Sequence, residues 1–255
     1  AGEEVVNRAL IVELDVTESK KDERDTKAAL EKEKELNQLK SNFVSLVSHE
    51  FRTPLSTIFS SSQLIEKYVE TKAQEKRLKH TGKIQSSVQH LNAMIEDILN
   101  LSKLEEGAVQ VNVSEFSLLE LVNKVAEELR ELFPNTELTV EGTQSMVNSD
   151  PKLAYHVISN IMQNSCKYGK PNGFTKVTVE EKNTEVIITV KDNGIGIAEK
   201  DKQNLFDRFY RGRNAENIKG TGLGLNIVGK YLELLVGKIS FESELNMGTE
   251  FKIII

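Results

Sequence analysis

The run SHEFRTPL, residues 48–55, decides the fold because it places one histidine outside a helical apolar stripe. The stripe consists of Val44, Val47, Phe51, Leu55, Ile58, Ser62, Ile65 and Val69. Its steps of three and four residues predict an amphipathic helix. At roughly 100° per residue, His49 and Thr53 point away from the stripe, and their i, i+4 spacing stacks them on one face. We therefore expect His49 to face solvent.

An exposed imidazole is largely neutral at pH 7 and carries a nitrogen lone pair that can attack phosphorus. Residues Ser48–Leu55 closely resemble the H-box of sensor histidine kinases. The resemblance implies that His49 is a phosphoacceptor and that Glu50 orients or deprotonates its ring. The alternative for His49 is a solvated surface histidine, which the flanking Glu, Thr and Pro pattern disfavours.

The composition indicates a globular protein of two domains, with 255 residues, 38% hydrophobic and 28% charged. A net charge of -6 argues against a surface that binds nucleic acid. No apolar run approaches the ~18 residues of a membrane helix, and no signal peptide opens the chain. We expect a cytoplasmic fragment without a membrane segment, or the intracellular part of a larger membrane-bound sensor.

The first 42 residues predict an input segment. Residues 1–15 include the strand-like run Arg8–Asp15, which resembles the exit from a PAS sensor domain, and Asp15 or Thr17 is the expected N-cap of the next helix. Residues 16–42 predict a signalling helix with a weak heptad seam at Ala29, Leu36 and Leu39, either as a two-stranded coiled coil or as a single solvated helix. The helix is expected to continue past His49 and to bend at Pro54.

A second helix follows a break at Tyr68–Gln74 and ends near Gly107. Its apolar stripe comprises Ile84, Val88, Leu91, Ile95, Ile98 and Ser102. Two antiparallel helices cannot bury two such stripes alone, so residues 43–107 predict a homodimer that forms a four-helix bundle. His80 and His90 lie in this helix without H-box neighbours, and we expect both at the surface.

Residues 108–255 contain both helical stretches, with apolar steps of three and four residues, and strand-like stretches. We therefore expect an α+β protein whose second domain is an α/β sandwich of mostly antiparallel strands. Helices are expected at Leu118–Leu132, Pro151–Lys167 and Leu223–Leu235. Strands are expected at Val109–Val113, Glu137–Glu141, Thr175–Glu181, Glu185–Lys191, Lys238–Glu242 and Thr249–Ile255. The polar stretch from Asn193 to Lys219 predicts a mobile lid.

Three stretches of this domain carry binding chemistry. Asn160 and Asn164 share one helix face with Lys167 one turn on, which suits Mg²⁺ and phosphate. Asp192 follows a strand and precedes glycines that admit a ligand to the backbone. The glycines of Gly220–Gly224 open a helix, where exposed amides attract phosphate. Hydrogen bonds between helix and strand are the alternative role for the two asparagines.

Another stretch, Leu205–Tyr210, lies between the Asp192 and Gly220–Gly224 stretches. In chain order the four stretches resemble the N-, G1-, F- and G2-boxes of the histidine-kinase ATP-binding domain. The resemblance covers about residues 34–255. It implies ATP and Mg²⁺ as cofactors, with Asn164 as the metal ligand and Asp192 as the reader of adenine. The implied nucleotide-binding residues are Asn160, Asn164, Lys167, Tyr168, Asp192, Gly194, Gly196, Phe206, Arg208, Gly220, Thr221, Gly222, Leu223, Gly224 and Thr249.

The sequence thus predicts a sensor histidine kinase that passes phosphoryl from His49 to an aspartate of a separate response regulator. Glu50-Phe51-Arg52-Thr53 resembles the E-x-x-T pattern of kinases that are also phosphatases, which implies a catalytic Thr53. The alternative for Thr53 is a structural bond to a backbone carbonyl one turn back. The alternatives for the chain are another GHKL-type ATPase, or an ATP-binding dimerisation module without phosphotransfer.

Overall fold

The computed structural model describes residues 21, 24, 26–27, 30–31, 33–34, 41, 44–45, 47–68, 73–182, 185–215, 218 and 220–255. By internal contacts the chain divides into two units, Ala1–Ser56 and Thr57–Ile255. The expected strand Arg8–Asp15, both candidate N-caps and the heptad seam lie outside the described residues. The described residues between 21 and 34 are helical and exposed.

The first helix is unbroken from residue 47 to residue 67 and therefore runs through Pro54. It ends at Tyr68, whose amide donates to the carbonyls of Leu64 and Ile65. This end agrees with the break expected at Tyr68–Gln74.

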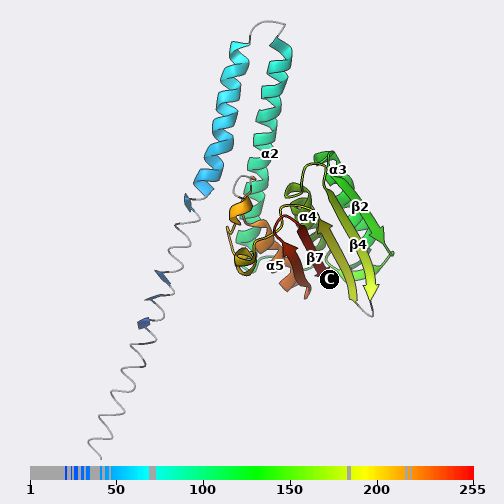
Figure 1. Cartoon of the computed structure of the whole chain (residues 1–255). Coiled ribbons are helices and arrows are strands. Elements are labelled where there is room, and N and C mark those ends of the chain that lie inside the picture. Colours follow the sequence, from blue (N-terminus) through cyan, green and yellow to red (C-terminus); the bar gives the residue numbers. More distant parts are fainter. Residues whose placement is uncertain are drawn as a thin grey trace, which may run out of the picture. The chain divides into compact units, whose positions relative to one another are not determined.

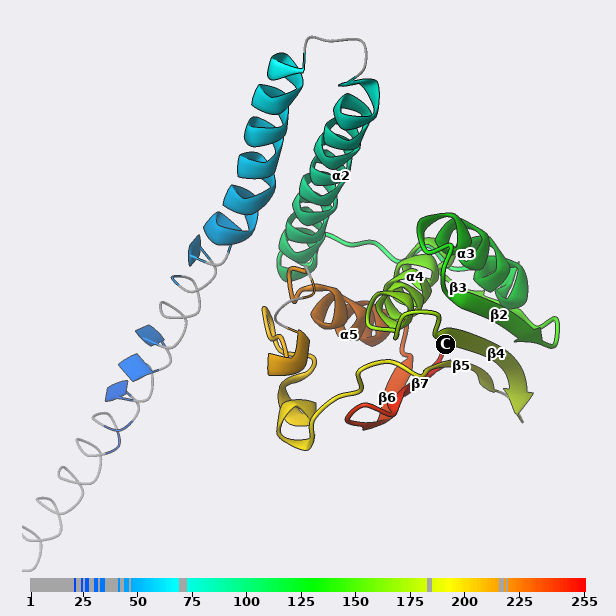
Figure 2. The same ribbon diagram turned by 45° about the horizontal axis from the view of Figure 1, so that its top comes forward.

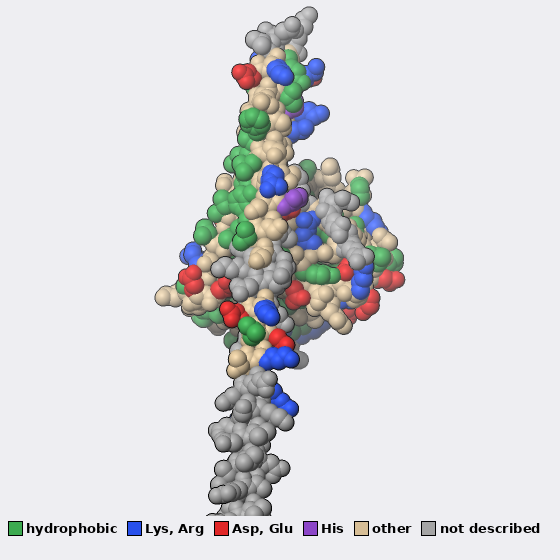
Figure 3. Space-filling model, turned by 90° about the vertical axis from the view of Figure 1, so that its left-hand side faces the viewer, with side chains coloured by type: hydrophobic (Ala, Val, Ile, Leu, Met, Phe, Trp, Pro, Cys, Tyr) green, Lys and Arg blue, Asp and Glu red, His purple; other side chains and the backbone are tan. Residues whose placement is uncertain are grey.

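Helix α2 spans Gln74–Glu105, and Gly107 follows it with φ +64°, as expected for a residue just beyond a helix end. Within unit Thr57–Ile255, α2 buries Ser87, Met94 and Leu101. The predicted stripe is partly exposed, since Val88 and Ile95 are each 43% exposed whereas Ile98 packs against the core. Figure 3 shows hydrophobic side chains gathered along the helical hairpin. A single chain therefore leaves this stripe open to a partner.

The remaining elements form an α/β sandwich (Figures 1 and 2). They are β1 (Ser114–Ser117), α3 (Leu118–Leu132), β2 (Glu137–Gly142), β3 (Met146–Ser149), α4 (Pro151–Lys167), β4 (Phe174–Lys182), β5 (Glu185–Asp192), η2 (Glu199–Asn204), η3 (Arg213–Ala215), α5 (Gly224–Leu234), β6 (Lys238–Glu244) and β7 (Gly248–Ile254). The strand order of the main sheet is β2-β4-β5-β7-β6, and only the β2–β4 pair is parallel. The predicted antiparallel majority is confirmed.

The core lies between this sheet and the helices α3, α4 and α5. Alternate residues of the central strands point into it, and cross-strand partners such as Val177 and Val190 are both fully buried. The facing helices contribute apolar stripes, including Val122, Val157 and Ile161. This packing fixes one end of α4 and the end of β5 beside each other, where the predicted binding residues lie.

One expectation about this domain was wrong, and one strand was missed. Val109–Val113 is not a strand, and the strand of this region is β1, which pairs antiparallel with β3 in a separate two-stranded sheet. β3 was not predicted at all.

None of the described helices is both long and apolar enough to cross a membrane.

Candidate active site

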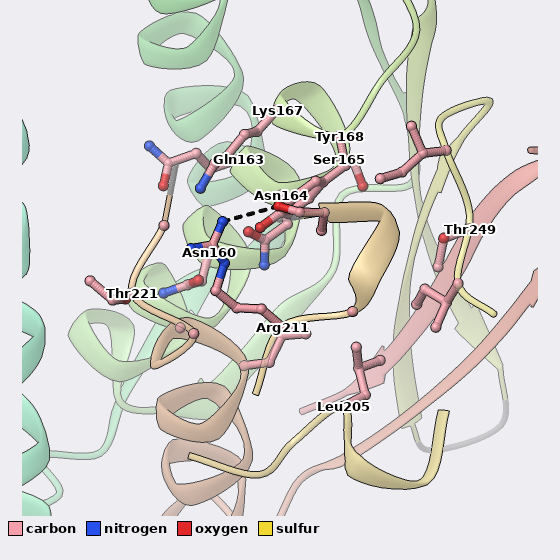
Figure 4. Close-up of a pocket in the computed structure, with 18 of the residues that line it drawn as sticks. Asn160, Gln163, Asn164, Ser165, Lys167, Tyr168, Leu205, Arg211, Thr221 and Thr249 are labelled. Atoms are coloured by element: carbon pink, nitrogen blue, oxygen red, sulfur yellow. Dashed lines mark hydrogen bonds between the residues drawn. The ribbon is translucent and has the colours of Figure 1, made fainter. Parts of the chain in front are cut away.

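Helix α4 presents the asparagines and lysine of the predicted nucleotide site on one face. Its N-terminus is fixed by Asp150, whose Oδ1 accepts from the amides of Lys152 and Leu153 at 2.8 and 3.1 Å. The opposite face is buried in the core, so Asn160, Asn164 and Lys167 turn toward a cavity. Figure 4 shows these side chains beside Tyr168, which caps the end of the helix.

The end of β5 supplies a buried carboxylate. Asp192 Oδ1 accepts from the amides of Gly194 and Thr249 at 2.8 and 3.2 Å, which fixes the orientation of the carboxyl group. Burial raises the pKa of Asp192, and the hydrogen bonds that its carboxylate accepts from the Gly194 and Thr249 amides partly oppose this rise. Asp192 lines the cavity, so the carboxylate is placed to accept a hydrogen bond from a ligand there.

Two glycines are required by the geometry of the site. Gly196 has φ +62°, and a Cβ at this position would lie 2.0 Å from the carbonyl oxygen of Glu244. A Cβ on Gly224, the first residue of α5, would lie 2.3 Å from Asn160 Oδ1. Any larger residue at 224 would displace Asn160, so the glycine-rich loop and the asparagine face of α4 are fitted to each other.

The cavity has a volume of about 600 Å³ and brings together most of the predicted nucleotide residues. Eleven of the fifteen line it: Asn160, Asn164, Lys167, Tyr168, Asp192, Gly196, Gly220, Thr221, Gly222, Gly224 and Thr249. In Figure 4 the α4 side chains and Thr249 approach the cavity from different elements. Amide oxygens, an ammonium group and a buried carboxylate therefore converge on one space.

The other four predicted residues lie outside the lining. Gly194 supports Asp192 through its amide, and Leu223 is buried in the core. Phe206 packs against Phe241 with ring centroids 6.1 Å apart. Arg208 forms an ion pair with Glu105 of α2. As placed here, these residues shape the surroundings of the cavity and do not reach into it.

Sequence reasoning missed other lining residues. Arg211 points into the cavity region (Figure 4) and donates from Nη2 to the carbonyls of Ala215 and Ile218 at 3.0 and 2.5 Å. Its signal was available, because it is the next basic residue after Arg208 and a phosphate site needs cations. Ser165, one residue past Asn164, is buried and also lines the cavity.

Helix α2 forms one wall of the cavity through Ser86, His90 and Asp97, among others. The expectation that His80 and His90 are surface residues was wrong. His90 is half-buried in this wall, and His80 is half-buried against Tyr68, with ring centroids 5.8 Å apart. No sequence pattern links α2 to the nucleotide residues, because the contact depends on how α2 packs beside α5.

The described residues of the polar stretch from Asn193 onward make specific contacts. It contains the short helices η2 and η3, and the side chain of Asn214 donates to the Gly196 carbonyl at 2.8 Å. Asn226 of α5 donates to the Phe206 carbonyl at 2.9 Å. The amide of Phe209 also donates to the Gly222 carbonyl at 3.0 Å, so the stretch contacts both glycine loops. Its mobility stays a prediction.

In the other unit, His49 has a side chain that is 73% exposed, as predicted from its position off the stripe. Its Nδ1 lies 3.5 Å from Oε1 of Glu50. The hydroxyl of Thr53 donates to the His49 carbonyl at 3.4 Å. The imidazole is therefore accessible, with one ring nitrogen beside a carboxylate and the other left for chemistry.

An exposed helical histidine beside a glutamate, in one chain with this cavity, defines a protein of the phosphotransfer class. Residues 39–107 match the family model of the His Kinase A (phospho-acceptor) domain. Residues 149–255 match that of the histidine kinase-, DNA gyrase B- and HSP90-like ATPase. The chain belongs to the sensor histidine kinases.

Relatives and solved structures agree with this assignment. The chain is 31% identical to the sensor protein RprX of Bacteroides fragilis over 87% of its own length and 44% of RprX. It is 31% identical to the autoinducer 2 sensor kinase/phosphatase LuxQ of Vibrio cholerae over 94% of its length and 29% of LuxQ. The structure of full-length ShkA in complex with AMPPNP matches at 25% identity with a TM-score of 0.60, over 82% of this chain and 44% of ShkA. The chain thus spans less than half of these relatives.

Proposed function

We propose that this chain is the kinase core of a sensor histidine kinase, which transfers the γ-phosphoryl group of ATP to His49. The observation that carries the proposal is the exposed imidazole paired with Glu50, in one chain with a cavity built for an adenine nucleotide. Residues 43–107 serve as the dimerisation and phosphoacceptor domain, and residues 108–255 as the ATP-binding domain.

The geometry at His49 supports different roles for the two ring nitrogens. Nδ1–H donates a hydrogen bond to Glu50, which keeps the proton on Nδ1. The lone pair on Nε2 is then the nucleophile. Nε2 attacks the γ-phosphorus, the new N–P bond forms, and the bond from phosphorus to the bridging oxygen breaks so that ADP leaves. The carboxylate of Glu50 offsets the positive charge that the ring gains.

In the cavity, Asp192 accepts a hydrogen bond from the adenine amino group, and Lys167 and the Gly220–Gly224 loop bind phosphate. The side-chain amide oxygens of Asn160 and Asn164 line the cavity and are hard donors of the kind that Mg²⁺ prefers. Asn164 would supply an amide oxygen to that ion. Bound Mg²⁺ would neutralise phosphate charge during transfer.

The next acceptor is an aspartate on a separate response regulator, and the kinase acts as a homodimer. The half-exposed stripe of the hairpin supports the dimer, since a lone chain leaves it uncovered. The phosphoacceptor family match supports the regulator as partner, because such a domain passes phosphoryl onward.

Incubation with Mg²⁺ and ATP labelled at the γ-phosphate tests the proposal. We expect label that is lost in acid and retained in base, as a phosphohistidine requires. His49→Gln should abolish labelling and leave nucleotide binding intact, because residue 49 is not one of the predicted nucleotide-binding residues. Equal labelling of the variant would overturn the assignment of His49. Nucleotide binding without labelling in the wild type would favour another GHKL ATPase or a non-catalytic dimerisation module.

A second activity, hydrolysis of the phosphorylated regulator, is favoured by Thr53 and by a relative named as a kinase/phosphatase. A hydroxyl one turn from His49 can hold a water in line with the acyl phosphate. Thr53→Ala should then retain autophosphorylation and slow dephosphorylation of the purified phospho-regulator. Loss of both activities would favour the structural role that its bond to the His49 carbonyl allows.

A further inference from the structure

Helix α2 contributes a carboxylate to the end of the cavity where the glycine-rich loop lies. The hydroxyl of Thr221 donates to Asp97 Oδ2 at 3.0 Å and accepts from the amide of Leu223 at 3.2 Å. Thr221 is thereby held between α2 and the start of α5. Asp97 lines the cavity together with Lys167 and Gly220.

The surroundings of Asp97 are those of an anion site. The ammonium group of Lys167 lies next to the loop, since a Cβ on Gly220 would be 2.7 Å from Nζ. Burial raises the pKa of Asp97, the Thr221 hydroxyl lowers it, neighbouring Glu96 raises it and Lys167 lowers it. The pKa of Asp97 is raised overall, and Thr221 and Lys167 oppose part of this rise because both favour the charged carboxylate. These two residues are also predicted to bind the nucleotide.

We propose that the Asp97 carboxylate competes with nucleotide phosphate for this end of the cavity, and that ATP binds fully only when Asp97 leaves Thr221. The proposal rests on the proposed function, which assigns this end of the cavity to phosphate. Two anions cannot share one ammonium and one hydroxyl without strong repulsion, so one must displace the other. The docking of α2 on the loop then sets the affinity for ATP, and by linkage ATP releases α2 from the loop.

A second contact at the same interface provides a matched control. Glu105 of α2 pairs with Arg208, and neither residue lines the cavity. Glu105→Gln loosens α2 without changing the charge inside the cavity. Asp97→Asn removes the charge and keeps an acceptor for Thr221, whereas Asp97→Ala removes both. These three variants separate charge competition from the hydrogen bond and from the docking of α2.

Calorimetric titration with ATP and with adenosine tests the proposal. Asp97→Ala should bind ATP roughly fivefold to fiftyfold more tightly than the wild type, with most of this gain also in Asp97→Asn. Adenosine affinity should not change, because adenosine carries no phosphate. Glu105→Gln should not raise affinity for ATP selectively. Thermal unfolding should be unaffected in all three, since Asp97 is only half-buried and Ala favours a helix.

Unchanged or weaker ATP binding in Asp97→Ala would overturn the proposal and make Asp97 a support for the loop. A gain in Asp97→Ala that is absent from Asp97→Asn would overturn charge competition in favour of the hydrogen bond alone. An equal gain for adenosine and ATP would show a generally opened cavity and would also overturn it. If the wild type bound no adenine nucleotide, the proposed function itself would fail, and this proposal with it.

Discussion

Asp192 supports the site through one carboxylate oxygen, and we propose that the other oxygen binds the adenine amino group. Both amides, of Gly194 and Thr249, donate to Oδ1, and an asparagine could keep these bonds through its own Oδ1. Its NH2 group would then replace the acceptor that the adenine amino group requires. Asp192→Asn should weaken ATP binding at least tenfold, about 1.4 kcal/mol, in a nucleotide titration.

Although Asp192→Asn should weaken ATP binding, we expect it not to lower the free energy of unfolding. Because burial raises the pKa of Asp192, the native state binds more protons than the unfolded state between the ordinary and the raised pKa. Stability therefore falls as pH rises through that interval. Without nucleotide at neutral pH, Asp192→Asn should be at least as stable as the wild type, and its unfolding free energy should vary less over the interval. Loss of stability together with binding would instead make the carboxylate a support of the fold.

Val236 has a strained backbone conformation, and its exposed side chain gains little from packing. It follows α5 with φ +56°, a conformation that β-branched residues rarely adopt, and its side chain is 89% exposed. Val236→Asn should raise the unfolding free energy by about 1 kcal/mol, since Asn tolerates this conformation and no packing is lost. Thermal or urea unfolding measures the change. Val236→Ala serves as the comparison, because it shortens the side chain and keeps a Cβ, and an equal gain there would refute the strain argument.

For single residues, the sequence predicts a functional role where a residue type is rarely found in that secondary structure. Six of the eleven predicted residues that line the cavity are mid-helix asparagines or clustered glycines, and these residue types are costly unless they serve a purpose. Ser165 and Asp97 are common helix-surface residues in a linear pattern, and only tertiary packing brings them to the cavity. Their contribution could not be predicted from local sequence.

Among the elements, α4 depends on a single capping residue, Asp150, which also binds the segment between α2 and β1. Asp150 is buried and accepts three amides, those of Lys152 and Leu153 at Oδ1 and that of Asn112 at Oδ2. Asp150→Ala leaves all three without an acceptor and should cost about 2 to 3 kcal/mol in chemical unfolding. Ser117, which caps α3 through one bond to Glu120, is the matched comparison, and Ser117→Ala should cost about 1 kcal/mol.

The pH dependence of that loss follows from the direction of the pKa shift. Burial acts to raise the pKa of Asp150, but the amides of Asn112, Leu153 and Lys152 outweigh it and hold the pKa below its ordinary value. The stabilisation is therefore present above the ordinary pKa and is lost as pH falls through the folded value. The difference between wild type and Asp150→Ala should shrink in acid, and a difference that grows there would contradict this assignment.

Elements were predictable where periodicity and capping agreed. The bounds of α3 and α4 match the expected Leu118–Leu132 and Pro151–Lys167, because apolar steps of three and four coincide with a cap and with Pro at N1. β1 and β3 were misplaced or missed because each has four residues and pairs only with the other. Such short strands owe their structure to a partner distant in sequence.

At the scale of the whole molecule, the helical hairpin of a single chain leaves several large apolar side chains exposed to solvent. Within unit Thr57–Ile255 the exposed large apolar residues of the hairpin are Phe59, Leu64, Leu78, Val88, Ile95 and Leu99. Val88 and Ile95 belong to the stripe expected from the sequence, whereas α2 buries Ser87, Met94 and Leu101 against its own chain. The helix thus has two apolar faces, and a second copy of the hairpin would cover the outer one.

This assignment predicts that a charge on the outer face separates the protomers without unfolding them. Ile95→Lys places an ammonium group in the proposed dimer interface, where burial without a partner costs several kcal/mol. Sedimentation should show a dimer for the wild type and a monomer for the variant, with unchanged helix content by circular dichroism. Gln89→Lys adds the same charge about 120° away around α2, on an exposed polar position, and should remain dimeric. Dissociation of both variants would indicate general charge repulsion, and a dimeric Ile95→Lys would place the interface on another surface.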